Sequence, residues 1–140
     1  MTSILEQIRF DKYSDGLVPA IVQDVKTKDV LMLGFMNREA LEKTMRGGNV
    51  TFWTRSRQKL WTKGETSGNV LKYISLRVNC ENDSLLVLAE PVGATCHTGH
   101  PTCYYRDAVN ESDDWRTITA QQFDPAEVYA IKNTQSDSSS

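Results

Sequence analysis

The sequence predicts an α+β domain that is mainly β and contains one short helix. Five short runs rich in apolar, aromatic or β-branched residues have the length of strands, and a single segment has helical periodicity. Their order is strand, strand, helix, strand, strand, strand, which is typical of an α+β domain. The chain of 140 residues is long enough for one domain with its own hydrophobic core.

The first two strands are predicted over residues 17–25 and 29–36. The runs LVPAIVQDV and DVLMLGFM are apolar and partly β-branched, and the polar residues KTK separate them. We expect the two strands to pair through this short turn.

The helix is predicted over residues 37–48, NREALEKTMRGG. Asn37 is a favourable N-cap, and Gly47 and Gly48 supply a stop after about three turns. One face of this helix carries the residues expected to pack on the core, which are Ala40, Leu41, Thr44 and Met45.

Three further strands are predicted over residues 50–55, 70–79 and 85–89. The first is aromatic and β-branched. The third, LLVLA, is apolar throughout and is expected to be buried on both faces. The polar turn at 81–84 joins the second and third strands, which we expect to form a hairpin at the centre of the sheet. The second strand alternates, so that one face carries Val70, Ile74, Leu76 and Val78.

After Tyr105 the sequence loses this periodicity. The segment 123–131, FDPAEVYAI, predicts one or two helical turns that begin at Asp-Pro. The polar end, NTQSDSSS, is expected to be disordered. We therefore divide the chain into a folded domain, residues 1–110, and a C-terminal arm with a disordered tail, residues 111–140.

Charge and hydropathy narrow the classes of partner. The net charge is −2, but residues 51–72 carry +4 and residues 107–140 carry −5. A local basic patch in an acidic chain favours a small phosphorylated ligand over nucleic acid, which requires a basic surface overall.

No run approaches the roughly 20 apolar residues of a membrane-spanning helix, and the start MTSILEQIRF lacks the apolar core of a secretory signal. We expect a cytoplasmic protein that binds neither nucleic acid nor membranes.

Both histidines and two of the three cysteines lie within CHTGHPTC, residues 96–103. Cytoplasmic thiols are kept reduced, and three cysteines cannot all pair, so a disulfide is disfavoured. Together with Cys80, the cluster offers the three protein ligands of a catalytic zinc ion, whose fourth position holds water. Other interpretations stay open. Cys80 could equally be a small buried hydrophobic residue. His97 could be a metal ligand, a general base or a surface residue, and His100 a loop residue with no role in the chemistry. The clustering itself could also arise by chance.

Two more segments are candidates for ligand binding. The turn NCEND, residues 79–83, holds two carboxylates and suits a hard cation such as Mg²⁺, although a solvated hairpin turn explains it equally well. The segment 52–69 interleaves tryptophans with cationic residues and ends in GETSGN. It fits a phosphate cradle with rings that stack on a nucleobase, or an exposed basic hairpin with its tryptophans in the core.

In this order, LMLGFMNREALEKT, FWTRSRQKLWTKGETSGN, NCEND and CHTGHPTC resemble the motifs of the phosphoribosyl-AMP cyclohydrolase family, over residues 12–105. The resemblance implies hydrolysis of the N1–C6 bond of the adenine ring of phosphoribosyl-AMP, a step of histidine biosynthesis that yields a formimino-carboxamide ribotide. It also implies a mixed, folded sheet and an intertwined homodimer whose zinc site lies between the subunits. Zinc lowers the pKa of a bound water towards about 7 and so supplies hydroxide.

The resemblance also assigns roles to individual residues. Cys80, Cys96 and Cys103 are the implied zinc ligands, and His97 is the candidate general acid–base. The remaining assignments concern the nucleotide substrate. They are Trp53 (or Trp61) beside the base, Arg55, Arg57 and Lys63 at the phosphates, Ser56, Thr66, Ser67 and Asn69 as hydrogen-bonding support, and Glu65 in the same set.

The implied magnesium site departs from the family's pattern, which is Asp-Cys-Asp-x-Asp. Asn79, Glu81 and Asp83 stand at its acidic positions here. One charge is lost and one carboxylate is a methylene longer, so we expect weaker Mg²⁺ binding or another metal. Two alternatives follow: a non-catalytic zinc-containing relative that binds a nucleotide, and a zinc module that binds single-stranded nucleic acid through residues 52–72.

Overall fold

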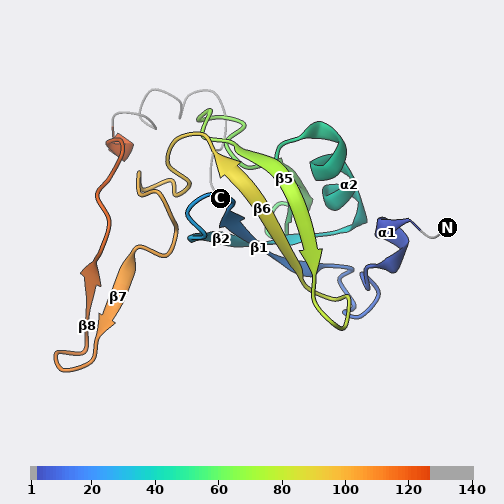
Figure 1. Ribbon diagram of the computed structural model, residues 1–140, viewed down its shortest axis with the longest axis horizontal. Helices are drawn as coiled ribbons and strands as arrows, with labels where there is room; N and C mark the ends of the chain where they lie inside the picture. Colours follow the sequence, from blue (N-terminus) through green and yellow to red (C-terminus); the bar gives the residue numbers. More distant parts are fainter. Residues whose placement is uncertain (1–2, 127–140) are drawn as a thin grey trace.

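The computed structural model describes residues 3–126, which form two short helices and eight strands (Figure 1). The fold is therefore mostly β, as predicted, with one helix more than expected. Along the chain the elements are α1 (Ile4–Gln7), β1 (Val18–Asp24), β2 (Val30–Met36), α2 (Arg38–Gly47), β3 (Thr51–Thr54), β4 (Lys59–Thr62), β5 (Leu71–Val78), β6 (Leu85–Pro91), β7 (Arg106–Val109) and β8 (Asp114–Thr117).

Four of these strands form a mixed sheet in the order β2-β1-β6-β5. β1 pairs antiparallel with β2, as the sequence predicted, and its other edge pairs parallel with β6. β5 and β6 form the expected antiparallel hairpin. The prediction that this hairpin is central is wrong for β5, because β1 occupies the other edge of β6 and leaves β5 at the edge of the sheet.

The predicted inward face of β5 is wrong at two positions. Ile74 is 48% exposed and Val78 is 44% exposed. The register of β5 against β6 shifts between Tyr73 and Ser75, and a one-residue shift reverses which side chains face the core, which accounts for Ile74. Val78 is the last residue of the strand. Leu71 is buried and Tyr73 packs against the core in place of Ile74, whereas Leu76 packs against the core as predicted.

Helix α2 begins and ends where the sequence predicts. The Ala40 N–H donates to Asn37 Oδ1 at 2.8 Å. Gly48 ends the helix with a φ of 82°, a left-handed conformation that glycine adopts without strain. The Thr51 N–H donates to Thr44 Oγ1 at 2.9 Å, which ties the helix to the start of β3.

β3 and β4 form a two-stranded hairpin, and β3 packs on β2. β3 was predicted as a strand, and β4 was not. One of the two interpretations of residues 52–69, a basic hairpin with its tryptophans in the core, agrees with this pairing and with the burial of Trp61. A Cβ atom built on Gly34 of β2 would lie 2.4 Å from Phe52 Cδ1. The glycine therefore allows the Phe52 ring to lie directly against β2, which fixes the hairpin on the sheet.

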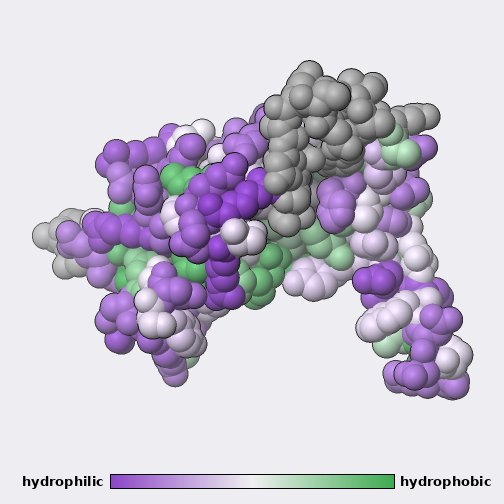
Figure 2. All heavy atoms as spheres, turned by 180° about the vertical axis from the view of Figure 1, so that it is seen from behind, coloured by the Kyte–Doolittle hydropathy of each residue, from purple (hydrophilic) through white to green (hydrophobic). Residues whose placement is uncertain are grey.

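β7 and β8 form a third antiparallel pair, which extends away from the sheet (Figure 1). The sequence did not predict it, because its side chains are almost all exposed and give no apolar periodicity. Trp115 in β8 is 62% exposed. Figure 2 shows hydrophobic surface in the middle of the molecule, between the body of the domain and this hairpin. The predicted domain boundary between residues 110 and 111 falls in the hairpin's turn.

The helix predicted over 123–131 lies only partly within the described residues. The Ala126 N–H donates to Asp124 Oδ1 at 2.9 Å where the chain enters a helical conformation. The rest of that segment and the predicted disordered tail lie outside the described residues. Over residues 3–126, no helix combines the length and the apolar character needed to cross a membrane.

Gly34→Ala is expected to destabilise the fold by about 1–3 kcal/mol, because the added methyl group overlaps the Phe52 ring. Gly47→Ala is the matched control, since a Cβ there meets nothing within 4 Å and alanine stabilises a helix by about 0.5–1 kcal/mol relative to glycine. Urea unfolding measures both free energies. Equal stability of Gly34→Ala and the wild type would contradict the packing of Phe52 on β2.

Candidate active site

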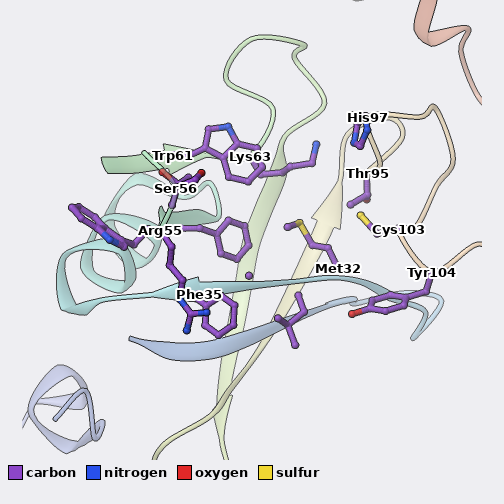
Figure 3. Close-up of a pocket in the computed structure, with 15 residues that line it drawn as sticks. Met32, Phe35, Arg55, Ser56, Trp61, Lys63, Thr95, His97, Cys103 and Tyr104 are labelled. Atoms are coloured by element: carbon purple, nitrogen blue, oxygen red, sulfur yellow. The ribbon is translucent and has the colours of Figure 1, made fainter. Parts of the chain in front are cut away.

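A pocket of about 540 Å³ opens between β2, the β3–β4 hairpin and the loop that follows β6 (Figure 3). This volume is typical of small-molecule sites. Apolar side chains come from β2, and aromatic and cationic side chains come from the hairpin. The loop after β6 contributes Thr95, His97 and Cys103.

Aromatic rings form one wall of this pocket. Phe52 and Trp61 stack with ring centroids 5.9 Å apart and an interplanar angle of 29°. Phe35 lies on the β2 side, and the Arg55 guanidinium sits 3.9 Å from its ring centroid. Arg55 also pairs with Asp15 at 3.3 Å, so two contacts hold the guanidinium at the pocket. An apolar aromatic wall with a cation at its edge suits a flat ligand that carries an anionic group.

Cys96 and Cys103 lie together in the loop after β6. The Cys103 N–H donates to the Leu31 carbonyl of β2 at 2.8 Å, which holds the loop to the sheet. A hydrogen bond between the two thiols lowers the pKa of Cys96 and raises the pKa of Cys103. Thr98 Oγ1 also donates to Cys96 Sγ at 3.0 Å. The pair supplies two sulfur ligands of the kind that zinc prefers.

The two histidines lie in different environments. His100 is 7% exposed, stacks on Tyr105 with ring centroids 3.8 Å apart, and its Nδ1 lies 2.7 Å from Thr119 Oγ1. His97 is exposed and lines the pocket, and Figure 3 shows its ring on the same side as Cys103. His97 is therefore the histidine available to a ligand, whereas His100 holds the loop in place.

Cys80 lies far from this pair. It is in the turn before β6, whereas Cys96 comes after the end of β6. β6 has seven residues, and a strand of that length spans about 23 Å. Within residues 3–126, no group of three His, Cys, Asp or Glu side chains lies close enough to hold one metal ion. One copy of the described chain thus brings together two of the three predicted zinc ligands.

Lys63 is 6% exposed and lines the pocket. Its Nζ donates to the Asn69 carbonyl at 3.1 Å. Burial lowers the pKa of Lys63, and the nearby Cys103 and Cys96 act in the opposite direction. In Figure 3 the side chain extends towards the loop that carries His97. The ammonium group therefore lies close to the thiols rather than on the open surface.

Hydrogen bonds close the β5–β6 turn around the predicted magnesium ligands. The N–H groups of Asp83 and Ser84 both donate to Asn79 Oδ1 at 2.9 Å, and Asn79 Nδ2 donates to Asp83 Oδ1 at 2.5 Å. Lys12 Nζ donates to Asp83 Oδ2 and, at 2.9 Å, to Glu81 Oε2. The bond from Lys12 lowers the pKa of Asp83, and the two carboxylates raise the pKa of Lys12. Mg²⁺ requires converging oxygen ligands, so this arrangement does not fit the ion.

Comparison with known proteins adds the family. The profile of the phosphoribosyl-AMP cyclohydrolase family matches residues 32–105. A phosphoribosyl-AMP cyclohydrolase of Desulfatibacillum aliphaticivorans is 49% identical over 124 residues, which cover 88% of this chain and 97% of the relative. The chain belongs to the phosphoribosyl-AMP cyclohydrolase family. All the residues that line the pocket fall within the family match, whereas Lys12 and the β7–β8 hairpin lie outside it.

Further relatives differ in length. A phosphoribosyl-AMP cyclohydrolase of Methanosarcina mazei is 49% identical over 118 residues, which cover 84% of this chain and 94% of the relative. The histidine biosynthesis bifunctional protein HisIE of Vibrio parahaemolyticus is 54% identical over 112 residues, which cover 80% of this chain and 53% of the relative. The chain therefore spans about half the length of that bifunctional relative.

The structure brings together part of the substrate-binding set that the cyclohydrolase resemblance implied. Four of those side chains line the pocket with His97 and Cys103: Trp53, Arg55, Ser56 and Lys63. Five others do not line it and lie in the β3–β4 turn or in the loop between β4 and β5: Arg57, Glu65, Thr66, Ser67 and Asn69.

Sequence reasoning missed several residues that line this pocket. Met32 and Phe35 were assigned only to a strand, and Tyr104 and Thr95 were assigned to nothing. Thr95 is 1% exposed, and its Oγ1 has no hydrogen-bond partner among the described residues. A buried hydroxyl without a partner is costly, which makes it a candidate ligand contact. In the sequence, only its position next to Cys96 indicates that Thr95 belongs to the site.

His100→Ala is expected to destabilise this family member by about 2 kcal/mol, because the variant loses a buried ring stack and a hydrogen bond. His97→Ala is the control and should change the free energy of unfolding by less than about 0.5 kcal/mol, since the ring is exposed. Urea unfolding compares the two variants. A larger effect at His97 than at His100 would reverse the roles assigned to the histidines.

Proposed function

We propose that the chain hydrolyses the N1–C6 bond of the adenine ring of phosphoribosyl-AMP, a step of histidine biosynthesis, as a zinc-dependent homodimer in the cytoplasm. The observation that carries the proposal is the pocket itself, where His97, Lys63 and Cys103 face an aromatic wall. The two relatives named phosphoribosyl-AMP cyclohydrolase support the reaction, because the chain covers nearly all of their length.

A zinc site shared between two copies of the chain accounts for the separation of the cysteines. Cys96 and Cys103 form a pair in one copy, and Cys80 of a second copy supplies the third ligand. Exposed apolar residues adjoin both halves of this site: Val78, close to Cys80, is 44% exposed, and Tyr104, next to Cys103, is 55% exposed. Contact with a second copy would remove this apolar surface from water.

The reaction requires a nucleophile at C6 and a proton at N1. A bound zinc ion supplies a water with a pKa low enough for attack at neutral pH. We assign to His97 the transfer of the proton that this water releases to N1, as the N1–C6 bond breaks. The oxygen of the water becomes the carbonyl oxygen of the carboxamide product, and its second proton passes to the exocyclic imino nitrogen at C6, which becomes the carboxamide NH₂. Atoms and charges therefore balance without an oxidant or a reductant.

The pocket residues divide between the base and the charged groups. The rings of Phe52, Trp61 and Trp53 suit the flat base, and Arg55 and Ser56 suit a phosphate. The burial of Lys63 beside the thiols favours a different role from the phosphate contact predicted above. Its ammonium offsets the negative charge of thiolate ligands. Roles for the five residues outside the pocket stay predictions.

The principal alternative is a non-catalytic zinc-containing relative that binds a nucleotide. The altered β5–β6 turn, with Asn79 in place of a carboxylate, is the feature that favours it. Purified zinc-loaded protein incubated with phosphoribosyl-AMP separates the two functions, because ring opening changes the ultraviolet absorbance of the nucleotide. We expect turnover. Nucleotide binding without any product would favour the alternative.

Cys103→Ala is expected to abolish zinc binding and turnover together, because a site with only two protein ligands holds zinc poorly. Zinc per chain is measured by atomic absorption, and turnover by the ultraviolet assay. Thr102→Ser, a change in the same loop that retains the hydroxyl donating to the Val30 carbonyl at 2.6 Å, is the control. Stoichiometric zinc and normal turnover in Cys103→Ala would show that Cys103 is not a ligand.

Thr95→Val is expected to lower kcat/KM by about tenfold or more, because a substrate contact is lost, without lowering stability. Its hydroxyl has no partner in the described residues, so the folded protein loses no hydrogen bond. Thr44→Val is the matched control, because the Thr44 hydroxyl donates to the Ala40 carbonyl at 2.9 Å and lies away from the pocket. That control should lose about 1–3 kcal/mol of stability and keep kcat/KM. A Thr95→Val protein with unchanged kcat/KM and lower stability would show that Thr95 does not contact the substrate.

A further inference from the structure

The ammonium group of Lys12 joins two carboxylates in the turn that contains Cys80. Lys12 Nζ donates to Glu81 Oε2 at 2.9 Å and also to Asp83 Oδ2. Asp83 is only 8% exposed, whereas the Glu81 side chain is 66% exposed. A carboxylate held largely out of water requires a cationic partner, and in this chain Lys12 is that partner.

Asn79 cannot act as an oxygen ligand in this arrangement. Its Oδ1 accepts two backbone N–H groups, from Asp83 and Ser84. Only the oxygen of an amide accepts such bonds, so the orientation of the side chain is fixed. Its Nδ2 then faces Asp83 Oδ1 at 2.5 Å. Both oxygens of Asp83 are thus engaged by nitrogen donors, and a divalent cation would have to displace them.

With Lys12, the turn has the same net charge as the metal-bound form of the family's pattern. Two carboxylates and one ammonium carry a net charge of −1. Three carboxylates with one divalent cation, which is the arrangement implied by the Asp-Cys-Asp-x-Asp pattern, carry the same net charge. Adding a divalent cation while the ammonium stays would place like charges within a few ångströms of each other, which is unfavourable.

The backbone fixes Lys12 beside the turn. The Arg9 N–H donates to the Asn82 carbonyl at 2.7 Å, and the Lys12 N–H donates to the Arg9 carbonyl at 3.2 Å. Phe10 packs against the hydrophobic core. The segment before β1 is therefore attached to the β5–β6 turn at a backbone contact and at an ion pair, and the ammonium group is held in place.

We propose that Lys12 is a built-in cation that takes the place of a divalent metal at the β5–β6 turn. The protein therefore requires no magnesium at this turn. By fixing the turn, Lys12 also positions Cys80 for the zinc site of a second copy, and this second part rests on the proposed function. Lys12 is a positioning residue, since it acts through the turn and not on the substrate.

The test compares melting temperatures of zinc-loaded proteins in magnesium-free buffer and in buffer with 5 mM MgCl₂. This concentration is an excess that fills a site with a dissociation constant of about 50 μM. NaCl is added to the magnesium-free buffer so that the ionic strengths are equal. Four proteins are compared: the wild type, Lys12→Ala, the double variant Lys12→Ala with Asn79→Asp, and Lys26→Ala. The last is the matched control, because Lys26 forms an ion pair with Glu90 at 3.1 Å on the exposed surface.

We expect MgCl₂ to leave the melting temperature of the wild type and of Lys26→Ala unchanged within about 1 °C. Lys12→Ala should melt lower than Lys26→Ala in both buffers. The double variant, with three carboxylates and no ammonium, should gain about 9 °C from MgCl₂. Isothermal titration calorimetry at 25 °C should give magnesium heats for the double variant only.

Magnesium binding by the wild type as tight as that of the double variant would overturn the proposal, as would a Lys12→Ala protein as stable as Lys26→Ala. If Lys12→Ala does not fold, Lys12→Arg retains the positive charge and should fold without magnesium. In that case the magnesium titration of the wild type still tests whether the turn requires no magnesium. These readouts need no substrate, so a failure here is distinct from a failure of the proposed reaction. A loss of zinc affinity in Lys12→Ala, with Lys26→Ala unchanged, tests the link to Cys80, and equal zinc affinity would remove that link.

Discussion

Strand β6 keeps the two halves of the candidate zinc site apart. Cys80 precedes the strand and the Cys96–Cys103 pair follows it. The strand itself spans about 23 Å, whereas zinc–sulfur bonds are about 2.3 Å long. β6 is buried between β1 and β5, so it cannot bend to close this distance without disrupting the core. Under the proposed function, the pocket of one copy is therefore incomplete until the turn of another copy reaches it.

The sequence predicted the elements that bury an apolar face. The caps at Asn37 and Gly48 define α2 because cap chemistry is local, and the apolar runs define β1, β2 and β6. The exposure of Ile74 was not predictable, because a one-residue register shift leaves no mark in an alternating pattern. The β7–β8 hairpin was not predicted because almost all of its side chains are exposed, so its sequence has no apolar periodicity.

The candidate site was predicted where its residues belong to one motif. Arg55, His97 and Cys103 were all identified from contiguous segments, and all three line the pocket. Lys12 was missed because its contacts join the segment before β1 to the turn after β5, and no sequence spacing encodes that contact. Thr95 was missed because an unsatisfied hydroxyl is a property of packing, not of residue type.

Subunit complementation tests the shared site most directly. Cys80→Ala and Cys103→Ala are each inactive in this account, but a dimer formed from one of each contains one complete set of Cys80, Cys96 and Cys103. An equal mixture after subunit exchange should recover about a quarter of wild-type turnover and of wild-type zinc, since half of the dimers are mixed and each has one of two sites intact. Mixed dimers that form but show no turnover and no zinc would contradict a site shared between two copies.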